Sequence, residues 1–172
     1  MIATTANELV MREDDFIVSK TNPKGKITYC NKIFIEFSEF TEIELLGQPH
    51  NIIRHPDMPR AVYRLMWKTL QEGNEFNGIV KNRTKTGKFY WTYANATPSY
   101  DIHDEVVGYY SVRRAPQRDT VKIMDSLYRD MINAESQHSN ATESMDASFA
   151  ILMDAIKTSG KEYNEYIISL EA

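Results

Sequence analysis

The stretch from Gly47 to Pro98 most constrains the fold of this 172-residue chain, because the signals of one helix and two strands follow each other there without a gap. Pro56 and Pro59 prevent a helix from starting earlier, and Asp57 between them is well placed to cap the helix that follows. This helix is expected to end at Gly73. Its apolar face consists of residues recurring at helical spacing, namely Val62, Leu65, Met66 and Leu70, with Trp67 beside them.

Two strands are predicted after this helix, over residues 76–83 and 88–100, with a Gly-containing turn at 85–87 between them. Alternation places Trp91 and Tyr93 on one face of the second strand and only small or polar side chains near the middle of the other. The bare face consists of Gly78, Val80 and Asn82 with Thr92, Ala94 and Ala96. Since an empty hole there would cost about 2–5 kcal/mol, either Met58, Met66 and Phe76 fill the space or a flat small molecule does.

Four sequence words in this region occur in a recognisable order, namely GQPHNIIRHPDMP, WKTL, GIVKNR and YW-x-x-ANA-x-P. With them the chain resembles a PAS domain, and in particular the flavin-binding PAS domain of bacterial aerotaxis receptors, from Thr21 to Arg114. The resemblance implies an α+β fold with a five-stranded antiparallel sheet and helices on one face. An N-terminal cap and C-terminal helices are expected in addition, and the chain is expected to be a short stand-alone or truncated member.

The expected organisation is an N-terminal cap over residues 1–15, a PAS sensor domain over 16–116 and a helical extension over 117–172. Leu9, Val10 and Ile17 are expected to give the cap its apolar contacts. Within the sensor domain, a first hairpin at 16–20 and 27–30 precedes a helix capped by Asn31 and a short turn of helix with a capping box, Thr41 and Glu44. The last strand is expected at 106–114.

The segment after Arg114 carries two apolar stripes at helical spacing, over 121–131 and 145–156, and a short final segment after Gly160. Such helices must pack on the outer sheet face, on one another or on a second copy. Trp91, Tyr93 and Tyr110 would form an aromatic patch on that outer face, so we expect a homodimer through the sheet face and its flanking helices. The alternative is that the helices fold back on their own sheet.

The candidate cofactor-binding residues come mainly from the resemblance. It implies that Arg54, His55 and Asp57 are needed for FAD, whereas without the family His55 and Asp57 would be interpreted as parts of the helix start. PAS-type flavin proteins have an Asn at the place of Asn82, whose amide suits the pyrimidine edge of a flavin. Thr92 could make a similar contact. The full candidate set is Arg54, His55, Asp57, Trp67, Phe76, Asn82, Thr92 and Arg113, with Phe76 where aerotaxis receptors typically have a tryptophan.

Several chemistries are not expected. The chain has 20 basic and 24 acidic residues, which gives no signature for nucleic acid. Its one cysteine, Cys30, falls in a strand, so neither a disulfide framework nor a flavin photoadduct is expected. His50 and His55 do not have the spacing of a helical metal pair, and no apolar run approaches the ~20 residues of a membrane span. No catalytic motif or secretory signal appears, so we expect a cytoplasmic protein that is not an enzyme.

Two classes of function remain. The first is a cytoplasmic redox or oxygen sensor that binds FAD non-covalently and relays the flavin state to the cap or the C-terminal helices. The second is a flavin-free PAS module for interaction or dimerisation, or a PAS domain that binds another ligand such as haem. In either case the downstream partner is expected to be a chemotaxis protein or another signalling protein.

Overall fold

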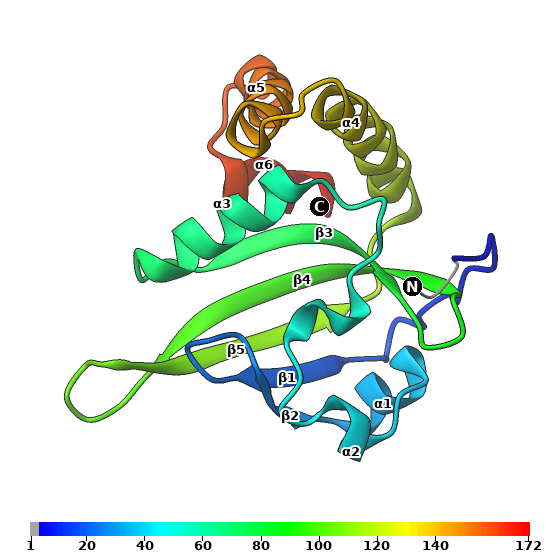
Figure 1. Cartoon of the computed structure of the whole chain (residues 1–172), viewed down its shortest axis with the longest axis vertical. Coiled ribbons are helices and arrows are strands. Elements are labelled where there is room, and N and C mark those ends of the chain that lie inside the picture. Colours follow the sequence, from blue (N-terminus) through cyan, green and yellow to red (C-terminus); the bar gives the residue numbers. More distant parts are fainter. Residues whose placement is uncertain (1–3) are drawn as a thin grey trace.

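The computed structural model describes residues 4–172, which form a five-stranded antiparallel sheet in the order β2-β1-β5-β4-β3 (Figure 1). The α+β fold expected from the sequence is confirmed. The strands are β1 (Ile17–Thr21), β2 (Ile27–Cys30), β3 (Phe76–Arg83), β4 (Phe89–Tyr100) and β5 (Val106–Arg114). The long hairpin of β3 and β4 pairs Gly78 with Ala94 and Val80 with Thr92, so the small side chains of both strands share one face.

One face of the sheet, called the inner face below, carries the helices that precede β3. These are α1 (Lys32–Ser38), α2 (Glu42–Leu45), the 3-10 helix η1 (His50–Ile53) and α3 (Arg60–Gln71). The caps predicted from sequence are confirmed: the Asn31 side chain accepts a hydrogen bond from the amide of Phe34, and Thr41 and Glu44 form a capping box. Local side chains therefore fix where the short helices begin.

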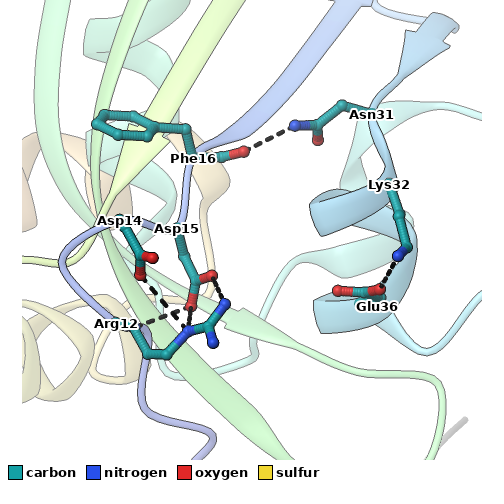
Figure 2. A network of polar contacts seen from close by, with 7 residues as sticks. All are labelled: Arg12, Asp14, Asp15, Phe16, Asn31, Lys32 and Glu36. Carbon is teal, nitrogen blue, oxygen red and sulfur yellow. Dashed lines mark hydrogen bonds and ion pairs between the residues drawn. The ribbon is translucent and has the colours of Figure 1, made fainter.

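Asn31 also ties α1 to β1, as Figure 2 shows in part. Its Nδ2 donates to the carbonyl of Phe16 over 2.7 Å, and its Oδ1 accepts from the amide of Val18 over 3.0 Å. In the turn before β1, the Arg12 guanidinium donates to the carboxylate of Asp15 over 2.9 Å. These contacts fix the entry of the chain into the sheet.

The start of α3 differs from the sequence prediction. Asp57 does not cap this helix, because the capping position is taken by Pro59, two residues later, and has no side-chain hydrogen bond. The Asp57 carboxylate instead pairs with the Lys81 ammonium of β3 over 2.6 Å. The free amide of Ala61 donates over 3.2 Å to Glu135, which belongs to α4. A residue distant in sequence therefore supplies the cap of α3.

Three C-terminal helices, α4 (Arg118–Ser136), α5 (Ala141–Ser159) and α6 (Tyr163–Leu170), gather at the β3 side of the sheet (Figure 1). On the outer sheet face, the Trp91 ring stacks on Tyr128 of α4 with centroids 6.4 Å apart, and Trp91 is only 5% exposed. The helices thus fold back on their own sheet, which was the alternative to packing on a second copy. The homodimer stays a prediction, but Trp91 no longer supports it.

Strand β3 lies at the edge of the sheet, and side chains close that edge. Asn164 of α6 accepts from the amide of Asn77 over 3.0 Å and donates to the carbonyl of Glu75 over 2.8 Å. The Tyr128 hydroxyl donates to the carbonyl of Ile79 over 2.8 Å. The edge strand is therefore protected from pairing with another chain, and its main chain is tied to α4 and α6.

The segment 4–15 is not helical and runs beside the start of β4. The amide of Leu9 donates to the carbonyl of Phe89 over 2.7 Å. Met11 is buried, whereas Val10 is 65% exposed, so the prediction that Val10 anchors this segment was wrong and Met11 takes that place. The first three residues of the expected cap lie outside the described part of the chain. β5 ends at Arg114 and α4 begins at Arg118; the division into cap, sensor domain and extension remains a prediction.

Candidate functional site

A cavity of about 370 Å³ lies between the inner sheet face and α3, within the size range of about 300–1,000 Å³ that is usual for small-molecule sites. β3 and β4 supply the bare wall anticipated from the sequence, with Val80, Asn82, Ala94 and Ala96. Met66 and Phe76 line the cavity without filling it, and Met58 lies aside in the hydrophobic core. Side chains therefore do not fill the space beside the bare face, and an open cavity remains there.

α3 and the β1–β2 turn form the opposite wall of the cavity. Trp67 and Tyr109 contact edge to face, with centroids 5.3 Å apart. Gly25 adopts a positive φ of 73°, and a Cβ atom there would come within 3.1 Å of the Trp67 ring. Glycine at this turn therefore lets the indole close one end of the cavity.

The other end of the cavity is polar and is built by Arg113, His50 and Ser19. The Arg113 Nη2 donates to the Ser19 hydroxyl over 2.6 Å and lies 2.7 Å from the His50 Nε2. Because a guanidinium can only donate, His50 Nε2 accepts and its ring proton is on Nδ1. Burial, together with the charge of Arg113, lowers the pKa of His50 to about 3, so this imidazole is neutral at pH 7.

Arg113 carries a positive charge that no carboxylate balances within residues 4–172. The residue is 4% exposed, and burial lowers its pKa to about 10, which still leaves it charged at pH 7. Its Nη1 is buried without a hydrogen-bond partner among the described residues, and so is the hydroxyl of Tyr90, which does not line the cavity. Buried donors are normally paired, so Nη1 of Arg113 points to a missing acceptor.

Asn82 and Thr92 lie together on the β3–β4 wall. The Asn82 Nδ2 donates to the Thr92 hydroxyl over 3.3 Å and to the carbonyl of Val80 over 3.4 Å. Asn82 lines the cavity, whereas Thr92 is fully buried behind it. The amide of Asn82 is therefore held in place by Thr92 and keeps its Oδ1 available to a ligand.

Only the first residue of the RHPD motif reaches the cavity. Arg54 lines it, with its guanidinium 4.1 Å from the centroid of the Tyr63 ring and one nitrogen 3.2 Å from the carbonyl of Met58. Asp57 lies on the other side of this segment, beside Lys81 and Trp91. His55 lies there too, and it also lines the more open cleft described below. The His55 Nδ1 accepts from the amide of Asp57 over 3.1 Å. Burial lowers the pKa of His55 to about 4, so this contact shapes the loop rather than pairing charges.

A second, more open cleft of about 680 Å³ adjoins the cavity, because Asn51 and Arg54 line both. Two further arginines line this cleft. Arg60 pairs over 3.1 Å with Glu135, which also lines it, and the Nε of Arg83 is buried without a partner in the described part of the chain. The cleft is thus rich in guanidinium groups, which suit phosphate oxygens.

Of the candidate residues, Trp67, Phe76, Asn82, Arg54 and Arg113 line the cavity, and their binding of a cofactor stays a prediction. Sequence reasoning did not name several other lining residues. His50 was considered only as a metal ligand, although it precedes Arg54 in the same motif. Alternation along β5 would have placed Tyr109 and Ser111 on the face of Arg113. Among the polar and aromatic lining residues that were missed are Ser19, Thr21, Lys24, His50, Asn51, Tyr63, Tyr109 and Ser111.

A five-stranded sheet whose inner face holds a helix-covered cavity agrees with the fold expected from the sequence words. The family model described as PAS fold matches residues 11–114, and the chain belongs to this family. It is 39% identical over 125 residues to the aerotaxis receptor of Escherichia coli. This match covers 73% of this chain and 24% of the receptor. It is also 30% identical over 86 residues to the oxygen sensor protein DosP of Escherichia coli, covering 47% of this chain and 10% of that protein.

The fold is similar to that of a solved light-oxygen-voltage domain studied with a flavin analogue. The TM-score is 0.57 at 21% sequence identity, and the match covers 67% of this chain and 86% of that domain. The match therefore spans less than a quarter of each of these two curated proteins and most of the light-oxygen-voltage domain. No helix within residues 4–172 is both long and apolar enough to cross a bilayer. In the same residues, no three His, Cys, Asp or Glu side chains gather as a metal site.

Proposed function

We propose that this PAS domain is a cytoplasmic redox or oxygen sensor that holds FAD non-covalently in the cavity beneath α3. The observation that carries the proposal is the cavity itself, with a flat wall of Ala94 and Ala96, the ordered amide of Asn82 and the unpartnered Nη1 of Arg113. These groups fit a planar ring system with an edge of hydrogen-bonding atoms. The similarity to an aerotaxis receptor and to an oxygen sensor supports the same class of function.

The adjoining cleft supports FAD over the shorter FMN. A ring system in the cavity would leave its side chain to pass Asn51 and Arg54, which line both spaces. Arg54 and Arg83 would then face the pyrophosphate, for which guanidinium groups are good partners. The chain's own residues would thus bind the ring system on one side of Arg54 and the dinucleotide tail on the other.

A bound flavin supplies reversible two-electron reduction. The residues that can report it are those that join the cavity wall to other elements: Phe76, which contacts α6 through Tyr163, and Asn82, next to Thr92. A shift of either side chain would change the packing of the C-terminal helices or of the strands. The proposed role is signalling without catalysis, to a chemotaxis or other signalling protein.

The first experiment is the absorption spectrum of the purified protein, followed by chromatography of the small molecule released on denaturation. A yellow protein that releases FAD agrees with the proposal. Release of FMN in place of FAD would agree with a flavin in the cavity, but it would reject the proposed role of the second cleft. A Soret band would indicate haem, and a colourless protein that cannot be reconstituted with FAD would refute the proposal.

A further inference from the structure

The lining of the cavity has an unbalanced charge. Three basic residues contribute to it, Lys24, Arg54 and Arg113, and no acidic residue among those described does. Lys24 is exposed in the β1–β2 turn, and Arg54 is only half-buried and also lines the adjoining cleft, where it is assigned to the pyrophosphate. Arg113 is therefore the buried cation available to a ligand in the cavity.

The surroundings of Arg113 hold it in position but do not neutralise it. Ser19 and His50 accept from its Nη2, and the Phe34 ring lies 5.3 Å from the guanidinium carbon. His50 is neutral at pH 7, and burial raises the pKa of both Tyr63 and Tyr90, so the hydroxyls stay protonated. A buried charge without a counterion is costly, and a negative charge on the ligand would remove that cost.

The position of Arg113 also limits where such a charge can lie. Arg113 pairs with Ala94 across the β4–β5 ladder, next to the flat wall, and with Ile17 across β1–β5. Arg113 lines the cavity, and its Nη1 is a donor without a partner among residues 4–172. A ligand edge that turns from neutral to anionic would find this charged donor already in place, without rearrangement of the protein.

We infer that Arg113 makes the cavity prefer the negatively charged form of its ligand, and that it therefore binds a reduced, N1-deprotonated flavin more tightly than an oxidised one. The flavin part of this inference rests on the proposed function. A flavin that accepts two electrons from a reductant and one proton at N5 carries a negative charge over its N1 and O2 edge. By reciprocity of binding and reduction, tighter binding of that form raises the midpoint potential of the bound flavin.

The test replaces Arg113 by Met and by Lys and measures the midpoint potential by dithionite titration against a reference dye. Arg113→Met is expected to weaken the reduced form about tenfold relative to the oxidised form, which lowers the two-electron potential by about 30 mV. Arg113→Lys keeps the positive charge, so its midpoint potential should stay close to that of the unchanged chain. Arg114→Met is the matched control, because Arg114 has the same charge on the next residue but lies over Tyr93 and pairs with Glu171.

A measurement on the unchanged protein covers the case in which Arg113→Met does not fold. Uptake of one proton per two electrons gives a slope of about 30 mV per pH unit, and uptake of two protons gives about 59 mV. If Arg113 stabilises the anionic form, the pH range in which the potential changes by only about 30 mV per pH unit should extend to lower pH for the bound flavin than for free flavin in the same buffer.

The outcomes separate the two proposals. Protein that binds no flavin rejects the proposed function and the inference with it. Protein that binds flavin, with the same potential in Arg113→Met as in the unchanged chain and a slope equal to that of free flavin, overturns the inference alone. A lower potential in Arg113→Met that is absent from Arg114→Met supports it.

Discussion

The Phe76 ring stacks on the Tyr163 ring, with centroids 5.4 Å apart and planes inclined by 20°. Phe76 lines the cavity, and Tyr163 is the first residue of α6. Gly78 makes room for the pair, since a Cβ atom there would lie 2.7 Å from the Phe76 ring and 3.3 Å from the Tyr163 hydroxyl. A ligand that displaces Phe76 therefore acts directly on the C-terminal helices.

The hydroxyl groups of Tyr163 and Tyr128 should differ in their contribution to stability. The Tyr163 hydroxyl is buried and has no partner within residues 4–172, so Tyr163→Phe should change the free energy of unfolding by less than about 0.5 kcal/mol or increase it. Tyr128→Phe removes the donor to the Ile79 carbonyl and should cost about 1–3 kcal/mol. Urea unfolding of both variants tests the pair. An equal cost for both would contradict the assigned hydrogen bond.

Asn82→Ala should weaken flavin binding by about 1–3 kcal/mol, because it removes a positioned amide from the cavity wall. The matched control is Asn95→Ala, which lies on the outer face of β4 and donates to Asn77 and Glu75. Fluorescence titration of the apoprotein with FAD measures both affinities. Unchanged affinity in Asn82→Ala would remove this residue from the site.

The three residues of the RHPD motif should act differently when each is replaced by Ala. Arg54→Ala opens the cavity wall. Its main effect should be a loss of flavin content, with a smaller effect on the free energy of unfolding. Asp57→Ala leaves Lys81, whose side chain is 12% exposed, without its carboxylate, and should cost about 1–2 kcal/mol of stability. His55 also lines the cleft proposed for the dinucleotide tail, so His55→Ala should lower both the flavin content and the stability. Flavin content per protein and urea unfolding of the apoprotein separate the two effects; equal flavin loss from all three with unchanged stability would place all three on the ligand.

His50 should make the apoprotein less stable in mild acid. Its pKa is about 3 in the folded chain and 6.5 in the reference state, so between these values the unfolded chain binds a proton that the native chain does not. Stability then falls as pH falls below about 6.5, by at most about 1.4 kcal/mol per pH unit for this group. His50→Gln keeps an acceptor for Arg113 and should flatten this decline in urea unfolding at several pH values. The exposed His103→Gln is the control and should leave the decline unchanged.

The expected homodimer is tested by light scattering on the full 172-residue chain and on a chain ending at Gln117. Removing α4 to α6 uncovers Trp91 and leaves the outer edge of β3 without the bonds from Tyr128 and Asn164, so the shorter chain should aggregate or form a weaker dimer. A full chain that is monomeric at tens of micromolar, in oxidised and reduced states, would reject the homodimer.

The elements that local chemistry determines could be predicted from the sequence. Asn31, the Thr41 capping box and the small residues facing each other across β3 and β4 each depend on neighbours within a few positions or on strand alternation. The polar end of the cavity could not be predicted in this way, because Ser19, His50 and Arg113 lie 31, 63 and 94 residues apart in their three pairs. Asp57 was placed wrongly for the same reason, since its partner Lys81 comes from another element.

Glu135 caps α3, and this has a consequence for the order in which the chain folds during synthesis. The amide of Ala61 and the guanidinium of Arg60 both bind Glu135, which lies beyond the residues that match the family. Domains generally form as they leave the ribosome, N-terminal parts first. The first turn of α3 cannot be completed until α4 has also emerged, so a nascent chain has every strand of the sheet before the helix above its cavity is secured.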